Sequence, residues 1–163
     1  MQKAEQLETR ETDLVFIYNK LSMIYSTLGN RELELAYDMK YLNMSLKSGD
    51  RNSIGSAYVN LGMYYHNMND KNKALEYYFK ALEYKAENKK SITYNNIAVV
   101  YEDLGNYDKA SEFYNKAIEL NLTTGNYLSL CSSKTNFGIF QYNQNNYLDA
   151  DKILNDANSI CHN

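Results

Sequence analysis

Three asparagines recur at matching places along the chain, and their side chains are suited to holding a peptide. Asn60, Asn96 and Asn136 follow one another at intervals of 36 and 40 residues. A carboxamide both donates and accepts hydrogen bonds, so it can pair with the N–H and C=O groups of an extended backbone. An apolar residue stands three positions after each of them, namely Met63, Val99 and Ile139. The pattern predicts a ligand-gripping ladder; the alternative is that each asparagine caps or bridges neighbouring helices.

Residues for catalysis, metal binding or cofactor binding form no recognisable pattern. Neither His66 nor His162 has an acidic residue placed to orient its ring beside a nucleophile. There is no Cys-x-x-Cys or His-x-x-x-His pair to suggest a metal site, and the glycines stand singly rather than in a phosphate-binding loop. We therefore expect no catalytic residue, no metal and no cofactor, and we do not expect an enzyme.

The two cysteines, Cys131 and Cys161, fall where a pair of antiparallel helices would begin and end. They could approach each other there, and an oxidising compartment would allow a bridge between them. Two cysteines are too few for a disulfide scaffold, and we expect two reduced thiols.

A helical hairpin is the element that must position the asparagines. Residues 94–117 contain two helical patterns separated by Gly105, a residue that readily takes the left-handed conformation that ends a helix. At about 100° per residue, large and small side chains gather on one face of each helix. These are Tyr94, Ile97, Ala98 and Tyr101 in the first helix and Tyr107, Ala110, Tyr114 and Ala117 in the second.

The same hairpin recurs three more times at intervals of 36 to 40 residues. Internal repeats of this length are typical of solenoids. The matching residues are Tyr58, Leu61, Gly62, Tyr65, Ala74, Tyr78 and Ala81 in one copy, Tyr18, Leu21, Ser22 and Tyr25 in another, and Phe137, Gly138, Ala150, Leu154 and Ala157 in the last.

These spacings resemble the tetratricopeptide repeat family. The resemblance implies an all-α fold, a right-handed α-α superhelix of antiparallel helix hairpins, arranged as a single array over residues 1–163. The repeats are expected at about 13–48, 52–88, 90–122 and 126–161. Residues 1–12 are expected to be either the end of a preceding second helix or a helical extension that covers the end of the array.

The expected helices are limited by turn residues and by the phase of the pattern. They cover about 13–28, 31–47, 52–68, 71–87, 90–104, 107–121, 126–143 and 146–161. The chain has no proline to interrupt them, and no segment shows the alternation expected of a strand.

The resemblance implies a concave groove lined by the first helix of each repeat, on the side opposite the stacking face. Some members of the family hold a partner's C-terminal carboxylate there with Lys and Asn, but no Lys or Arg stands at those positions in this chain. The predicted groove residues are Asn19, Met23, Asn60, Met63, His66, Asn67, Asn95, Asn96, Val99, Glu102, Asp103, Asn136, Ile139, Tyr142 and Asn143.

Composition narrows the class of partner. A net charge of −3 argues against a nucleic-acid surface, which normally carries a basic stripe. No run of 18 apolar residues is present, and the N-terminus lacks the apolar segment of a signal peptide. We expect a protein or peptide partner, no nucleic acid, no membrane contact by this segment, and self-association through open solenoid ends.

Two functions remain open from the sequence. The first is a non-catalytic scaffold that binds a peptide or protein in the concave groove. The second is the sensory or docking segment of a larger bacterial signalling regulator, such as a histidine kinase or a transcription regulator. We expect a cytoplasmic location, with the periplasmic part of a membrane-bound regulator as the alternative.

Overall fold

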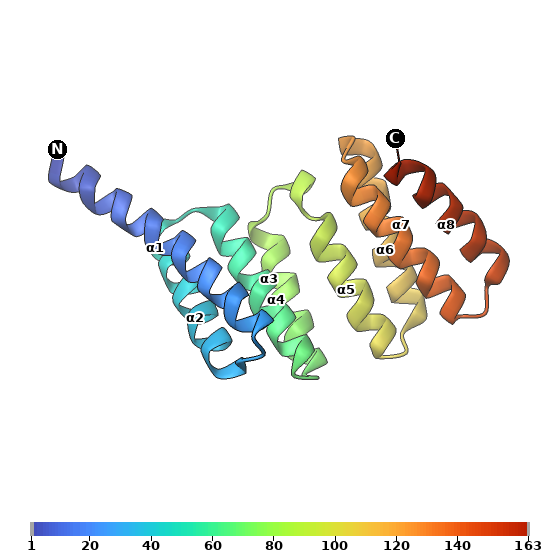
Figure 1. Cartoon of the computed structure of the whole chain (residues 1–163), viewed down its shortest axis with the longest axis horizontal. Helices are drawn as coiled ribbons and strands as arrows, with labels where there is room; N and C mark the ends of the chain where they lie inside the picture. The colour runs from blue at the N-terminus through green and yellow to red at the C-terminus, as the bar shows by residue number, and fades with distance from the viewer. Residues whose placement is uncertain (1, 163) are drawn as a thin grey trace. The chain divides into compact units, whose positions relative to one another are not determined.

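The computed structural model describes the backbone of residues 2–162 and the side chains of residues 13–162. This part of the chain is built from α-helices with one short 3₁₀ helix and contains no β-strand (Figure 1). The predicted fold class, an all-α repeat of antiparallel helix hairpins, is confirmed. The elements are α1 (Gln2–Thr27), α2 (Arg31–Ser48), α3 (Arg51–Asn67), α4 (Lys71–Tyr84), η1 (Glu87–Lys89), α5 (Ser91–Asp103), α6 (Tyr107–Thr124), α7 (Tyr127–Asn143) and α8 (Tyr147–Cys161).

The helix bounds agree closely with the sequence pattern except at three places. The helix expected from residue 13 begins at Gln2, so residues 2–12 continue α1 without a break. The helix expected to reach residue 87 ends at Tyr84, and η1 follows it. The helix expected to end at residue 121 continues to Thr124, where Gly125 closes it with φ +66°.

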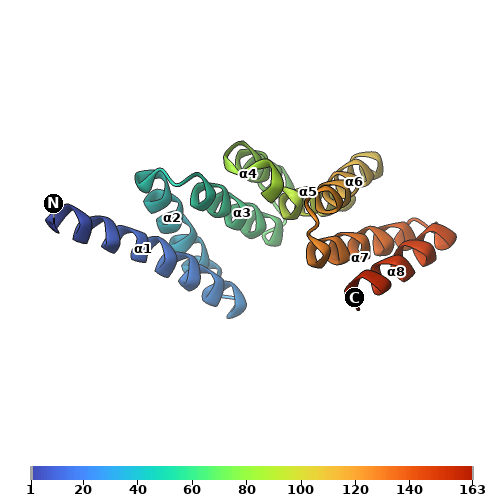
Figure 2. The ribbon, with the colours of Figure 1, turned by 90° about the horizontal axis from the view of Figure 1, so that it is seen from above.

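The chain divides into two compact units, each made of two hairpins. The N-terminal unit, Met1–Lys85, contains α1 to α4, and the C-terminal unit, Ala86–Asn163, contains η1 and α5 to α8. The helices of each hairpin lie side by side in both views (Figure 1, Figure 2). Within the units, α2 also packs against α3, and α6 packs against α7.

Left-handed residues close the turns inside the hairpins. Gly29 and Gly105 take φ +71° and +72°, as the sequence predicts for a turn glycine. In the two hairpins without such a glycine, Asn69 and Asn145 take the same conformation with φ 61° and 62°. Asparagine is one of the few other residues that tolerate it, because its short side chain can hydrogen-bond locally.

Large side chains pack onto small residues in the core of each hairpin. A Cβ atom added to Gly62 would lie 2.5 Å from Cε1 of Tyr78, so the ring rests directly on the glycine backbone. Gly138 receives Leu154 in the same way. The aromatic-on-small contact predicted from the repeat is therefore present between α3 and α4, and a leucine takes the place of the aromatic residue between α7 and α8.

The expectation of two reduced thiols is wrong. Cys131 and Cys161 form a disulfide with their Cα atoms 5.6 Å apart. The antiparallel course of α7 and α8 brings the start of α7 close to the end of α8, which is the approach expected from the sequence. The bond joins the two ends of a hairpin at a distance typical of native disulfides.

Candidate functional site

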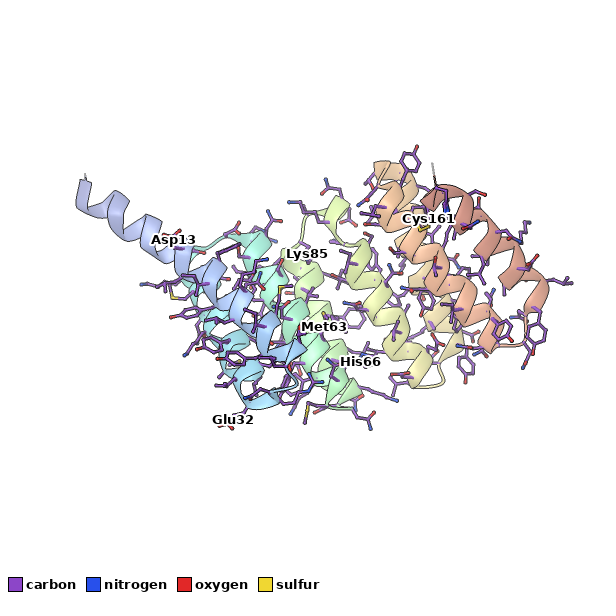
Figure 3. The ribbon with its side chains drawn as sticks, viewed as in Figure 1. Asp13, Glu32, Met63, His66, Lys85 and Cys161 are labelled. Carbon is purple, nitrogen blue, oxygen red and sulfur yellow. A yellow bond between two sulfur atoms is a disulfide. The ribbon has the colours of Figure 1, made fainter. Side chains whose placement is uncertain are left out.

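A cleft of about 220 Å³ opens on the N-terminal unit among α1, α2 and α3. Three of the residues predicted for the groove, Met23, Asn60 and Met63, lie on it. Figure 3 shows Met63 on α3, in the N-terminal unit. The full lining is Ser22, Met23, Ser26, Thr27, Glu34, Asp38, Asn60 and Met63.

Two carboxyl groups on α2 form the polar wall of the cleft, and both are nearly inaccessible to solvent. Asp38 is 1% exposed and Glu34 is 3% exposed. Glu34 forms an ion pair with Arg31, with 2.7 Å between Nη1 and Oε2. Asp38 accepts a short hydrogen bond from the Ser22 hydroxyl on α1. A buried carboxylate needs such partners, because leaving it without a hydrogen bond or an opposite charge costs roughly several kcal/mol.

Burial raises the pKa of Asp38 to about 6, from an ordinary value of 3.8. Hydrogen bonds from Ser22 and Asn60 favour the charged form and offset part of this effect, while the nearby charge of Glu34 adds to it. Asp38 therefore changes its charge near pH 6, about two pH units above the range of surface carboxyl groups.

The carboxyl groups stand where the other hairpins carry apolar residues. A step of 40 residues from Glu34 and Asp38 leads to Ala74 and Tyr78, and Ser22 corresponds to Gly62. Tyr78 fills the space above Gly62 in α3–α4. In α1–α2 a serine–aspartate hydrogen bond replaces that contact, and the smaller aspartate leaves room for the cleft.

Glu34 and Asp38 are absent from the predicted groove. The prediction took its residues from first helices only, and these two side chains come from a second helix. One signal in the sequence could have pointed to them, because the segment from residue 30 to residue 47 fits the second-helix pattern only with a shift.

Asn60 joins the three helices around the cleft. Its Nδ2 donates to Asn19 Oδ1 on α1 at 3.1 Å, and its side chain also hydrogen-bonds Asp38 on α2. Of the residues predicted for the groove, Met23, Asn60 and Met63 line this cleft, and Asn19 lies beside it through its hydrogen bond to Asn60. It also engages Asn60 in bridging helices, which is the alternative role that the sequence left open for it. His66 and Asn67 lie further along α3 and do not line the cleft.

Asn95, in the C-terminal unit, was predicted to line an open groove, but it does not face one. Its side chain is buried, and its Nδ2 donates to Ser133 Oγ on α7 at 2.7 Å. Asn121 on α6 donates to the same hydroxyl at 2.9 Å. The close approach of α5 and α7 turns this part of the expected groove into an interior polar contact.

Glu102 lies at the meeting point of three helices in the C-terminal unit. It accepts a hydrogen bond from the Tyr114 hydroxyl on α6 at 3.0 Å and from Asn143 Nδ2 on α7 at 3.3 Å. Burial raises the pKa of the Tyr114 hydroxyl, and the nearby negative charge of Glu102 raises it further. The predicted residues Glu102 and Asn143 are therefore in contact, whereas Asp103 is exposed.

The remaining predicted residues of this unit lie on α5 and α7 and differ in exposure. Asn96, Val99 and Asn136 are half-buried, and Ile139 and Tyr142 are exposed. Tyr142 makes an edge-on contact with Tyr147, with 5.2 Å between the ring centroids. The ladder of three asparagines as a whole stays a prediction.

The described part of the chain contains neither a cluster of metal ligands nor a helix that could span a membrane. Among its residues, no group of three or more His, Cys, Asp or Glu side chains is placed to hold a metal ion. None of the described helices combines the length and the apolar character needed to cross a membrane.

Comparison with solved structures shows the same fold in several proteins. BtubC (BKLC) from P. vanneervenii is 20% identical with a TM-score of 0.78, and the match covers 99% of this chain and 73% of that one. The apo form of RapI is 18% identical with a TM-score of 0.79, covering 92% of this chain and 56% of RapI. A signal transduction ATPase with a tetratricopeptide repeat sensor, from Pyrococcus horikoshii, is 22% identical with a TM-score of 0.76, covering 98% of this chain and 26% of the ATPase.

Sequence comparison identifies the repeat directly. No curated protein sequence matches the chain. Two tetratricopeptide repeat profiles match it, one at residues 55–88 and the other at residues 91–123. Repeats of this kind are typical of protein–protein interaction scaffolds and are in general not catalytic. The chain therefore contains tetratricopeptide repeats at residues 55–88 and 91–123, which are recognised in the sequence itself.

Proposed function

We propose that this chain is a non-catalytic scaffold that binds an extended segment of a partner protein on the first-helix face of its repeats. The observation that carries the proposal is the cleft of the N-terminal unit, where predicted groove residues surround a pair of buried carboxyl groups. Affinity would come from apolar contact, shape and amide pairing, as in other peptide-binding grooves.

The chemistry of the cleft favours a basic side chain at the anchoring position. Asp38 and Glu34 offer acceptors and negative charge, and a Lys or Arg side chain would supply donors and the opposite charge. Met23 and Met63 are both about half exposed at the rim. Methionine is flexible and polarisable, so these two side chains can adapt to the aliphatic stem of a lysine or arginine.

A selection experiment tests this proposal before the partner is identified. The immobilised chain is offered a library of random 12-residue peptides, and the bound fraction is sequenced. We expect enrichment of Lys or Arg at one position, and loss of that enrichment in the double variant Glu34→Gln, Asp38→Asn. The control is Glu119→Gln, Asp151→Asn, which makes the same charge change at exposed sites. Enrichment that survives in the cleft variant would contradict the anchoring role.

The asparagine ladder is tested separately with the triple variant Asn60→Ala, Asn96→Ala, Asn136→Ala. If these side chains hold the ligand backbone, the selected peptide binds more weakly while the far-UV helical signal is unchanged. A loss of helicity would instead assign them a structural role, which the contacts of Asn60 already favour for that residue.

The second candidate is a sensory or docking segment of a larger signalling protein. It is favoured by the likeness in fold to a signal transduction ATPase whose tetratricopeptide repeats form its sensor, of which this chain spans 26%. An ATPase, kinase or DNA-binding domain encoded in the same reading frame would support this candidate, and a frame without one would leave the free-standing scaffold.

The disulfide supports a proposal for the cellular compartment in which the chain resides. Cytosolic thiols are kept reduced by glutathione and thioredoxin, so a bond between Cys131 and Cys161 favours an oxidising compartment. Of the two locations expected from the sequence, we propose the periplasmic one. Alkylation of acid-quenched cells followed by mass spectrometry would show unmodified, bonded cysteines there and two alkylated thiols in the cytoplasm.

A further inference from the structure

A second pocket, of about 270 Å³, lies in the C-terminal unit beside η1, the start of α5 and the last turns of α6. It is distinct from the predicted groove, because none of the residues predicted for that groove lines it. Its wall combines an aromatic ring, aliphatic surface and charged groups. We name it the η1 pocket, and its lining residues are Glu87, Tyr94, Lys116, Glu119, Leu120 and Thr123.

The corresponding place in the second hairpin, α3–α4, is filled by an arginine of the chain itself. The Tyr84 ring packs against the Tyr58 ring, with 5.6 Å between the centroids. Arg51 lies over Tyr84, with Cζ 5.3 Å from the ring centroid, and its Nη2 donates to the backbone carbonyl of Glu83. A guanidinium is attracted to the face of an aromatic ring and can donate to acceptors around the edge of its own plane. This part of the repeat is therefore suited to holding an arginine.

The third hairpin, α5–α6, keeps the ring but lacks the two side chains that lie on it. A step of 36 residues from Tyr58 leads to Tyr94. The same step replaces the second tyrosine by Leu120 and the arginine by Glu87. Leucine is smaller than tyrosine, and a carboxylate is not attracted to the negative face of a ring. On this alignment the η1 pocket lies where the second hairpin holds its tyrosine and its arginine.

Carboxylates are the hydrogen-bond acceptors at the η1 pocket. In the second hairpin α4 ends one residue after Glu83, so the Glu83 carbonyl is free to accept from a side chain. In the third hairpin α6 continues past Glu119, so the equivalent carbonyl lies within the helix. The Glu119 side chain is exposed, and that of Glu87 is 74% exposed although it pairs with Lys90 at 2.6 Å. Both carboxylates are thus open to a cation in the pocket.

Lys116, the positive group in the lining, is held by contacts outside the pocket. Its Nζ donates to Glu112 at 2.5 Å and lies over the Phe113 ring, 4.7 Å from the centroid. Lys80 makes the same two contacts with the residues 36 positions earlier. The hairpin that contains Lys80 also contains Arg51 on its tyrosine. A lysine at this position is therefore compatible with an arginine bound nearby.

We propose that the η1 pocket binds an arginine side chain of a partner protein, with the guanidinium on the Tyr94 ring and its N–H groups directed to Glu87 and Glu119. An aromatic side chain would fill the space but leave the two carboxylates without an opposite charge, and an anionic group would be repelled by them. Lysine supplies the charge but not the planar group that stacks on a ring and donates to two acceptors. This site lies in a different unit from the proposed peptide cleft and does not depend on it.

Nuclear magnetic resonance of the isotope-labelled whole chain, titrated with N-acetylargininamide, tests the proposal. We expect the Tyr94 and Glu119 signals to shift to saturation with a dissociation constant of about 1–10 mM, because a single side chain binds weakly. A nuclear Overhauser effect between the arginine δ-methylene group and the Tyr94 ring is expected as well. N-acetylcitrullinamide is the control probe, since its urea group has a similar planar shape without the charge, and it should bind about fivefold more weakly.

The same titration reads the two sites separately. A probe bound in the cleft of the N-terminal unit shifts the signals of Met23 and Met63, which line that cleft. A probe in the η1 pocket shifts those of Tyr94 and Glu119. Shifts confined to the two methionines would support the cleft and overturn the η1 pocket, and the reverse result would support the pocket whatever the outcome at the cleft.

Two variants test the contacts of the η1 pocket. Glu119→Gln should weaken binding about two- to fivefold, whereas the control Glu83→Gln makes the same change at an exposed, matching place of the second hairpin and should have no effect. Glu87→Arg with Leu120→Tyr installs the pair that fills the second hairpin and should weaken binding at least about tenfold. Far-UV circular dichroism checks that each variant is folded. Equal binding of the two probes, an unaffected Glu119→Gln variant, or a folded double variant that binds normally would each overturn the proposal.

Discussion

The substitution Asp38→Asn removes a negative charge whose burial lowers the free energy of unfolding. The pKa of Asp38 is about 6 in the folded chain against an ordinary value of 3.8. Each tenfold change in proton affinity corresponds to about 1.4 kcal/mol. The ionised carboxylate therefore lowers the free energy of unfolding by about 3 kcal/mol relative to its protonated form.

The sign of the pH dependence follows from the raised pKa. Below about pH 3 the carboxyl group is protonated in both the folded and the unfolded chain, and it has no effect on stability. Between about pH 3 and pH 6 the unfolded chain releases the proton while the folded chain keeps it. The free energy of unfolding therefore falls as the pH rises through this window, and this contribution is constant above it.

Urea unfolding followed by circular dichroism at pH 4, 5, 6, 7 and 8 measures the effect. Asparagine has nearly the same shape as aspartic acid and can still accept the hydrogen bond from Ser22. We expect the variant to lie within about 0.6 kcal/mol of the wild type at pH 4 and to exceed its stability by up to about 3 kcal/mol at pH 7. That figure already includes the hydrogen bonds from Ser22 and Asn60, which favour the charged form of Asp38.

The comparison with an exposed aspartate isolates burial as the cause. Asp151→Asn on α8 removes the same charge at the surface and should show no such trend. A stability difference between wild type and Asp38→Asn that does not change with pH, or a variant less stable than the wild type at pH 7, would refute the reasoning.

Three further substitutions test the contacts within the hairpins. Gly62→Ala sets a methyl group against the Tyr78 ring and should cost about 1–3 kcal/mol in urea unfolding, with no change if the ring is free to move away. Ala110→Glu buries a charge at a fully buried position and should cost about 3–5 kcal/mol; an unchanged melting temperature would contradict the repeat alignment. Reduction of the Cys131–Cys161 bond opens a loop with a sequence separation of 30 and should cost about 3–4 kcal/mol, so a melting curve insensitive to reductant would argue against the bond.

The hairpins themselves could be predicted from the sequence because the same contact is repeated. Tyr78 on Gly62 illustrates this, since a large residue and a small one at a fixed separation require two helices in close contact. Asn95 shows the limit of such reasoning. Its angle on α5 is compatible with a groove, but its burial depends on how closely α7 approaches, and helical phase says nothing about that distance.

The sequence prediction missed the cleft for a related reason. The repeat pattern describes what the copies share, whereas the cleft arises where one copy departs from the others. Glu34 and Asp38 read as surface residues of an ordinary helix until their alignment with Ala74 and Tyr78 places them in the core.

That departure is also the strongest argument that the cleft has a function. Three hairpins of this chain hold their helices together with apolar residues on small ones, so the fold does not require carboxyl groups there. The first hairpin uses them although the ionised form of Asp38 is disfavoured by about 3 kcal/mol. A cationic side chain bound in the cleft would lower the pKa of Asp38 and recover part of that free energy, so a selected basic peptide should bind more tightly at pH 7 than at pH 5. An equal affinity at the two pH values would show that the charge of Asp38 does not contribute to peptide binding in the cleft.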